Sequence, residues 1–450
     1  MKKNVLVKTK SSPNIEDVSN QSSLKFFVAL LVFSYISCFA TRSFPVYCLI
    51  LAVYAAIALR LNNSQNLSFI LMTITLVPTN FLSVFNSELL RQLSPVNIIA
   101  VVFIAKNLPA KNLKLYGWIA VVSLVLAINM TVTIDFRWSI SMSSRIIFLT
   151  LCLVMSTEDV RKIDWKQQVD TIVKLLSILA PFGLIEAFTN AQPLFSGNFG
   201  LPIFASLDQQ QIFGRTLLTF GQANVAAMVL ATFFIVILYD GLILKNKSYW
   251  NNFILCLTAF VIYSTGSRSG TLAILLGTFW VLLMKITNGK SVGIFLILIP
   301  ATYLGLASLL FDFISHLTSF GFGRNAAEAT TNWELRKTIL TNRKIFDDLP
   351  FLGVGNGNAQ KYYALNGNGS ILENSAFQIF IGFGFFLGIL LILIWFFLLL
   401  KSVSMSSISI YIPTFFFLMS SNAWEGTRFI QILLGVLTCM ARAADLKKTP

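Results

Sequence analysis

Long uninterrupted runs of apolar residues constrain this 450-residue chain more than any other feature. A helix of about 20 residues is needed to cross a bilayer core of about 30 Å, and many of the runs approach that length. Charged residues make up 12% of the chain, about half the share in soluble domains, and hydrophobic residues make up 56%. The pattern predicts an all-α polytopic membrane protein and excludes an outer-membrane barrel, whose strands alternate polar and apolar residues.

The apolar runs predict one helical bundle of about 12–14 transmembrane helices over residues 25–441. A polar tail at 1–24 precedes the bundle and a second tail at 442–450 follows it, and we expect both tails to be cytoplasmic. The first run has no small-residue cleavage pattern behind it, so we interpret it as an uncleaved span rather than a signal peptide. The runs lie near 25–41, 45–60, 67–86, 96–106, 115–134, 139–155, 170–190, 222–244, 251–265, 270–287, 291–312, 375–400, 405–420 and 428–441.

Lysine and arginine divide between the two sides of this predicted bundle. Cytoplasmic loops of membrane proteins are enriched in basic residues, so the lysine-rich loops indicate an N-terminus on the inside with all runs spanning. Only Lys337, Lys344 and Lys361 then fall on the outer side. The outer side or outer membrane edge collects Arg42, Arg91, Arg137, Arg145, Arg215, Arg268, Arg324, Arg336, Arg343 and Arg428.

The arginines on the outer side predict a binding site for an anion. The guanidinium group is a planar, always charged fork that matches phosphate and carboxylate oxygens. For each arginine taken singly, the alternative is a loop residue at the depth of the lipid headgroups. The net charge of +15 therefore reflects topology and anion binding, and a nucleic-acid partner is excluded by the membrane composition.

Two long outer segments, at about 191–221 and 313–374, interrupt the otherwise short connections. The second segment lies between the eleventh and twelfth predicted spans and contains a helix signal, which predicts a partly helical periplasmic loop. Arg336 and Arg343 lie seven residues apart on nearly one face of that helix, so together they could grip an extended anion. The alternative is a helix that lies on the membrane with a basic polar face.

Metal and nucleotide chemistry find no support in the sequence. The five cysteines lie in or at the ends of apolar runs without a CxxC pair, and the single histidine, His316, cannot build a metal site. The sequence has neither a P-loop nor a dinucleotide-binding fingerprint. We therefore expect neither a metal nor a cofactor.

Polar motifs stand at the outer ends of several predicted spans. Ser264 to Gly270 reads STGSRSG, and Arg268 at that depth is costly unless an anion meets it. Arg215 precedes a polar stretch that ends at Asn224, where a helix N-terminus favours anions. Glu373, Asn374 and Ser375 come directly before the twelfth span.

In this order, the motifs resemble those of the O-antigen ligase and Wzy-type polymerase superfamily. The similarity covers residues 210–400 approximately, whereas the N-terminal 200 residues match only as helical spans. It is carried by the run from Arg215 to Asn224, the turn Gly266-Ser267-Arg268-Ser269-Gly270, Arg336 followed by Pro350-Phe351-Leu352-Gly353-Val354-Gly355, and Glu373-Asn374-Ser375.

The resemblance implies a metal-independent glycosyltransferase in the bacterial inner membrane, with its active site facing the periplasm. Its donor would be a polyprenyl-pyrophosphate-linked oligosaccharide, and it would also contact membrane lipid and a chain-length regulator protein. By matching motif, Arg268 and Arg336 would hold the donor pyrophosphate with help from Arg215. Further substrate contacts are predicted for Asn224, Arg343 and Asn374.

The position of the base departs from the family pattern. Ligases of the superfamily usually carry a histidine directly before the asparagine of the last motif, where this chain has Glu373. A carboxylate serves as a base where its surroundings raise its pKa, so Glu373 is the candidate base. The alternative is that Glu373 caps a helix or pairs with an arginine.

Three functions remain open at this point. A polymerase would transfer the growing glycan to a sugar hydroxyl of another lipid-linked unit, whereas a ligase would transfer it to lipid A core or to a protein. A transporter of lipid-linked glycans is less favoured, because transporters usually contain internal repeats and charges within spans. We find no convincing repeat, and Lys174 and Glu186 are the clearest charges within spans.

Overall fold

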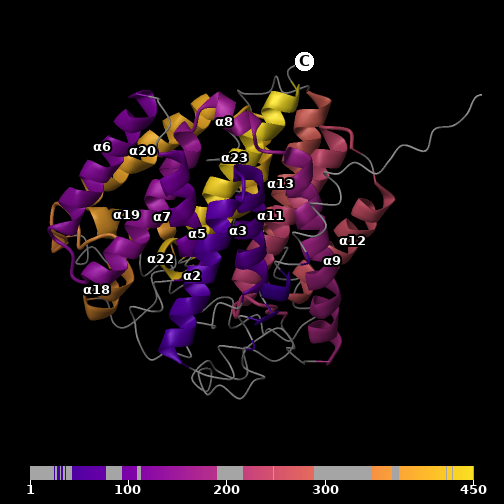
Figure 1. The fold of residues 1–450 in the computed structure, drawn as a ribbon, viewed down its shortest axis with the longest axis horizontal. Coiled ribbons are helices and arrows are strands. Elements are labelled where there is room, and N and C mark those ends of the chain that lie inside the picture. The colour runs from indigo at the N-terminus through magenta and orange to yellow at the C-terminus, as the bar shows by residue number, and fades with distance from the viewer. Residues whose placement is uncertain are drawn as a thin grey trace, which may run out of the picture.

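A computed structural model confirms the predicted all-α fold. Every regular element in the described part of the chain is a helix (Figure 1), and that part contains no strand. The structure describes residues 25, 28–30, 32–33, 36, 43–77, 94–108, 113–189, 216–246, 248–287, 347–366, 374–421, 423–427 and 429–448.

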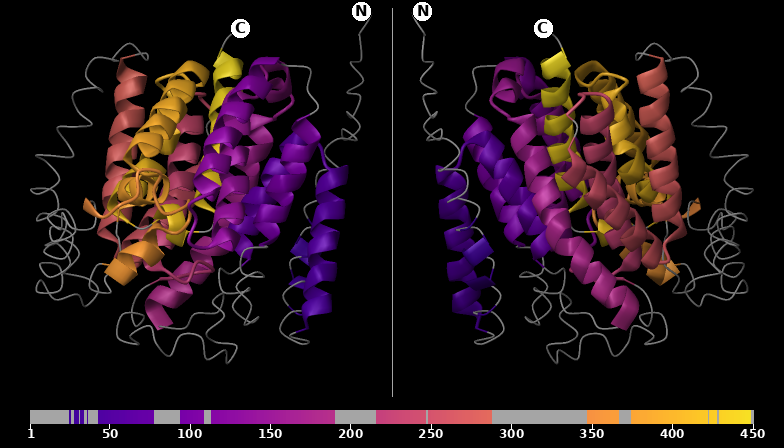
Figure 2. Two further views of the ribbon diagram at one scale, coloured as in Figure 1. Left: turned by 90° about the vertical axis from the view of Figure 1, so that its left-hand side faces the viewer. Right: turned by 90° about the vertical axis from the view of Figure 1, so that its right-hand side faces the viewer.

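The helices form a bundle in which most axes run in roughly the same direction (Figure 2). In chain order they are α2 (Phe44–Arg60), α3 (Asn63–Leu76), α5 (Pro95–Asn107), α6 (Leu113–Met130), α7 (Phe136–Val154), α8 (Thr157–Arg161), α9 (Trp165–Thr189), α11 (Ala223–Leu242), α12 (Tyr249–Ser264), α13 (Arg268–Ile286), α18 (Ala359–Asn366), α19 (Ser375–Phe383), α20 (Phe385–Ser402), the 3₁₀ helix η5 (Ser407–Tyr411), α21 (Ile412–Ser420), α22 (Ala423–Gly426) and α23 (Ile430–Lys448).

Five of these helices are long and apolar enough to cross a membrane, by length and composition. Shorter apolar helices cover several of the other predicted runs, including the run at 96–106, which forms α5. Pro95 occupies the first turn of α5, and the Ser94 side chain caps it by accepting the N–H of Asn97. The five long helices are Phe136–Val154, Trp165–Thr189, Ala223–Leu242, Ser269–Ile286 and Phe385–Ser402.

The ends of the chain and of the apolar runs differ in detail from the sequence prediction. The predicted run at 375–400 is not one helix, because Gly384 separates α19 from α20 with a φ of 75°. Helix α23 continues to Lys448, so residues 442–448 of the predicted tail are helical. The run at 291–312 lies outside the described residues.

Lysines predicted on the inner side gather at one end of the bundle, which we name the lysine end. Lys106, near the end of α5, donates to the carbonyl groups of Ala58 and Leu61 at the end of α2. Lys447 of α23 lies 3.4 Å from the carboxylate of Asp164, just before α9. We name the opposite end, near which α18 lies in Figure 1, the loop end.

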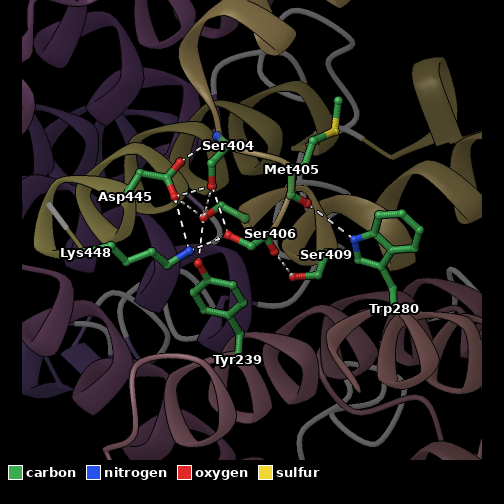
Figure 3. Close-up of polar contacts among 9 residues, drawn as sticks. Tyr239, Trp280, Ser404, Met405, Ser406, Ser409, Asp445 and Lys448 are labelled. Atoms are coloured by element: carbon green, nitrogen blue, oxygen red, sulfur yellow. Dashed lines mark hydrogen bonds and ion pairs between the residues drawn. The ribbon is translucent and has the colours of Figure 1, made fainter. Parts of the chain in front are cut away.

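A polar network fixes α23 at the lysine end (Figure 3). The Asp445 carboxylate accepts the backbone N–H of Ser404 at 2.7 Å and the hydroxyl of Ser407 at 2.6 Å. The Ser407 hydroxyl also lies 2.7 Å from that of Tyr239, and the Lys448 ammonium lies 4.8 Å from the centre of the Tyr239 ring. The network therefore joins α11, η5 and α23.

Arg145 lies inside the bundle rather than in a loop at headgroup depth. Its side chain on α7 is 2% exposed. Its Nε donates to Asn97 Oδ1 of α5 at 3.1 Å, and its Nη2 donates to the Ser141 hydroxyl at 2.8 Å. Buried polar groups need such partners, so this arginine contributes to the packing of α5 on α7.

Candidate active site at the loop end

The structure describes three of the seven predicted site residues, and for Arg268 only the backbone. Arg268 is the first residue of α13, Asn224 is an exposed residue in the first turn of α11, and Asn374 is the N-cap of α19. The four predicted site residues outside the described residues are Arg215, Arg336, Arg343 and Glu373.

The turn before Arg268 is stabilised by hydrogen bonds from backbone N–H groups to the hydroxyl groups of Thr265 and Ser267. Ser267 caps α13 by accepting the N–H of Gly270 at 3.2 Å, and Thr265 Oγ1 accepts the N–H of Ser267 at 3.1 Å. Gly266 has a φ of 61°, a conformation that glycine adopts readily. Arg268 therefore begins a helix whose free N–H groups and dipole favour an anion.

Residues that follow Arg215 are joined to this turn. The backbone N–H of Thr216 donates to the Ser264 carbonyl at 3.3 Å, and the two hydroxyl groups lie 2.7 Å apart. A Cβ on Gly270 would lie 2.4 Å from that of Ala227, so α13 and α11 pack closely just below the turn. The structure thus brings together two of the motifs that the sequence singled out.

A glycine-rich turn, Gly353 to Asn358, forms the second polar cluster of the loop end. Gly353, Gly355 and Gly357 have φ values of 76°, 95° and 85°. The turn pairs with the end of α19, because the N–H groups of Val354 and Gly355 donate to the Ile381 and Gly382 carbonyls at 3.1 and 3.0 Å. These conformations require glycine, which explains the spacing of glycines in the sequence.

Asn129 and Asn358 fix the same turn to α6 and α7. Asn129 donates through Nδ2 to the Gly382 carbonyl at 2.8 Å and accepts the Asn356 N–H at 2.6 Å. Asn358 Nδ2 donates to the Thr133 and Ser139 hydroxyl groups at 2.8 and 3.1 Å. The turn is consequently held by backbone and side chains from three helices.

Glu425 of α22, which the sequence analysis did not single out, holds the chain after the glycine-rich turn. Its carboxylate accepts the backbone N–H groups of Ala359 at 2.9 Å and Gln360 at 2.8 Å. Its own N–H donates to Gln378 Oε1 of α19 at 3.1 Å. Because these partners lie more than forty residues away along the chain, no local sequence pattern predicts the contact.

Asn374 fixes the start of α19. Its Oδ1 accepts the N–H groups of Ala376 and Phe377 at 2.9 and 3.3 Å, and its Nδ2 donates to the Met419 carbonyl at 3.2 Å. The neighbouring Ser375 hydroxyl donates to the Ser421 carbonyl at 3.1 Å. Asn374 therefore has a structural role, and its contact with substrate stays a prediction.

The Arg268 turn and the glycine-rich turn belong to one end of the bundle. Helix α21 packs against both α11 and α13, and α19 packs against α21 and α22. The rings of Phe220, just before α11, and Phe429, just before α23, lie 6.2 Å apart. Within the described residues, no group of histidine, cysteine, aspartate and glutamate side chains is arranged to hold a metal ion.

Protonation of Glu425 is expected to stabilise the fold at low pH. Glu425 lies outside the candidate membrane spans. Burial raises its pKa from the ordinary 4.5 to about 7, although the hydrogen bonds from backbone N–H groups act to lower it. The unfolded chain loses this proton first as the pH rises from 4.5 to 7, so stability decreases across that range.

Thermal unfolding of the solubilised protein at pH 5 and pH 8 would measure this contribution. The wild-type midpoint is expected to fall between the two pH values by more than that of the Glu425→Gln variant, which cannot ionise there. Glu158→Gln, at an exposed position of α8, is the matched control and should follow the wild type. Equal shifts in the wild type and the Glu425→Gln variant would contradict the prediction.

Residues 253–396 match the model of the O-antigen ligase family. No curated protein and no solved structure matches the chain. The matched residues include most of α12 and the whole of α13, the glycine-rich turn and α19, together with Arg268, Arg336, Arg343, Glu373 and Asn374. Arg215 and Asn224 lie before the matched residues. The motifs and this match agree: residues 253–396 of this all-helical chain, which has five described helices long and apolar enough to cross a membrane, are similar to the O-antigen ligase family.

Proposed function

We propose that this protein polymerises lipid-linked oligosaccharide repeat units of the O-antigen or capsule type. It would transfer a glycan from polyprenyl pyrophosphate to a sugar hydroxyl of another lipid-linked unit, on the outer face of the bacterial inner membrane. The observation that carries the proposal is the O-antigen ligase match at 253–396, since this segment contains the Arg268 turn, the loop arginines and the motif at Glu373.

The proposed reaction is a displacement at the anomeric carbon of the donor sugar. The acceptor oxygen forms a bond to that carbon, the bond to the pyrophosphate oxygen breaks, and its electron pair leaves with the lipid pyrophosphate. Arg268 and Arg336, assisted by Arg215, would stabilise the charge that grows on the leaving group. The acceptor proton would pass to Glu373 as the general base.

A specific residue favours polymerisation over ligation. Ligases of this superfamily usually carry histidine where this chain has Glu373, so the acceptor side of the site differs from that of a ligase. The description of the matching family, O-antigen ligase, supports the second candidate, which is transfer to lipid A core or to a protein. Under the first candidate, a chain-length regulator protein is the expected partner.

Deletion of the gene would test the proposal and separate the two candidates. We would resolve surface glycans on a gel and extract the lipid-linked pool. A surface that carries only single repeat units, restored to a ladder by the wild-type gene, would support polymerisation. Uncapped acceptor with long chains still on the lipid carrier would indicate ligation, and unchanged glycans would contradict both.

Glu373→Gln is expected to abolish transfer without weakening donor binding. The amide is similar in size to the carboxylate, but it cannot take a proton from the acceptor hydroxyl, and general-base catalysis contributes about 10²–10⁴-fold. Glycan ladders in the complemented deletion strain and binding of undecaprenyl pyrophosphate to the purified protein would measure the two effects. A fully active Glu373→Gln variant would show that Glu373 is not the base.

A further inference from the structure

Glu186, near the end of α9, is a buried carboxylate in contact with the chain that follows Arg215. Its side chain is 1% exposed. One oxygen, Oε2, accepts the backbone N–H groups of both Leu217 and Leu218, at 2.7 and 2.9 Å. The other oxygen has no hydrogen-bond partner within the described residues. Within the described part of the chain, the carboxylate thus accepts hydrogen bonds only from the turn at Leu217 and Leu218.

The turn adopts a conformation that the carboxylate helps to hold. Leu218 has a φ of 52°, in the left-handed region that residues other than glycine rarely adopt. In this region, successive backbone N–H groups converge on one point and form a concave anion site, which the Glu186 carboxylate fills. Removal of the carboxylate would leave two buried N–H groups unpaired in a strained turn.

A continuous set of contacts leads from Glu186 to the turn that carries Arg268. Thr216 directly precedes the two leucines, and its hydroxyl lies 2.7 Å from that of Ser264 and 3.3 Å from the Gly183 carbonyl on α9. A Cβ on Gly183 would lie 2.4 Å from the Val261 side chain, so α9 and α12 are in close contact here. The carboxylate therefore fixes the segment after Arg215 against the end of α12.

We propose that Glu186 is a positioning residue that couples the segment after Arg215 to the Arg268 turn and so shapes the binding site for the donor pyrophosphate. The inference rests on the proposed function, because it assigns these two segments to donor binding. Glu186 acts through the backbone of the turn, since its own side chain is buried. A misplacement of about 1 Å in such a site can reduce catalysis about 100-fold.

Two substitutions at Glu186 separate positioning from proton transfer. Glu186→Gln keeps an oxygen that can accept both N–H groups, so it should retain near wild-type transfer. Glu186→Leu removes the acceptor and is expected to raise the donor KM by about tenfold or more, with a smaller change in kcat. The Kd for undecaprenyl pyrophosphate, measured on purified protein in lipid nanodiscs, should rise in parallel, and hydrogen exchange at 216–218 and 264–267 should become faster.

Thr216→Val tests the same coupling where Glu186→Leu fails to fold. It removes the hydroxyl that meets Ser264 but keeps the branched shape, and we expect a smaller rise in KM and Kd. Thr73→Val is the matched control, because the buried Thr73 hydroxyl bonds only to the Phe69 carbonyl of its own helix among the described residues. The control should leave both constants unchanged.

The outcomes distinguish the inference from the proposed function. Wild-type KM and Kd in both Glu186→Leu and Thr216→Val would overturn the positioning role, as would a Glu186→Gln variant that loses transfer as fully as Glu186→Leu. Surface glycans that stay unchanged when the gene is deleted would instead contradict the proposed function. If deletion of the gene and Arg268→Ala both abolish transfer while Glu186→Leu and Thr216→Val keep the wild-type KM and Kd, the positioning role of Glu186 is wrong and the proposed function stands.

Discussion

Replacement of Arg268 by either alanine or lysine is expected to abolish glycan transfer while the protein still inserts at normal levels. Loss of one preorganised donor to a developing negative charge typically reduces kcat by about 10²–10³-fold. Lysine keeps the charge but loses the planar pair of N–H donors that matches phosphate oxygens. The Arg268 backbone begins α13 and its turn is closed by Ser267, so both variants can keep the local fold.

Complementation of the deletion strain would measure this effect as the intensity of the glycan ladder, normalised to the amount of membrane-inserted protein. Arg161→Ala, at an exposed position at the end of α8, is the matched control and should restore the full ladder. Retained activity in both Arg268 variants would remove this arginine from the proposed site.

Gly384→Ala is expected to destabilise the loop end strongly. Gly384 has a φ of 75°, and a Cβ there would lie 2.1 Å from the Phe351 carbonyl oxygen and 2.7 Å from the Gly353 nitrogen. Gly384 combines this φ with a ψ of 158°, a region essentially restricted to glycine that costs about 1–3 kcal/mol for a residue with a Cβ. Overlap with a backbone that cannot move aside adds about 1–3 kcal/mol.

Gly117→Ala provides the matched control in the same protein. A Cβ at Gly117, an exposed position of α6, would meet nothing within 4 Å. Alanine favours the helix over glycine by about 0.8–1.0 kcal/mol, so this variant should match or exceed the wild type in stability. Thermal unfolding of the two solubilised variants would compare them, and equal midpoints would contradict the structural role of Gly384.

Most of the helical architecture was predictable because apolar length is a local property of the sequence. The short run at 96–106 proved to be a helix with its own proline and serine start signals, Pro95 and Ser94. The break at Gly384 was not predictable from hydropathy, because it depends on the backbone of Phe351, more than thirty residues away. Hydropathy measures how apolar a segment is, but it does not show which distant part of the backbone packs against that segment.

The polar contacts of the loop end also depend on residues that are distant in the sequence, so they too were hard to predict. The sequence singled out the arginines and glycines of the site by type and order, and the O-antigen ligase match includes most of them. It noted Glu186 only as a charge within a span and did not single out Glu425. Both carboxylates bind backbone N–H groups, which every residue except proline carries, so no pattern of side chains marks their partners.

Helix α23 has a consequence for the biogenesis of the protein. It is buried along most of its length, with Leu433, Val436 and Leu437 fully enclosed, and it packs against α7, α3, α9 and η5. Yet α23 is translated after every other described helix. The ribosome therefore delivers this buried helix after the described helices that it packs against, and those helices are synthesised before their contacts with α23 can form.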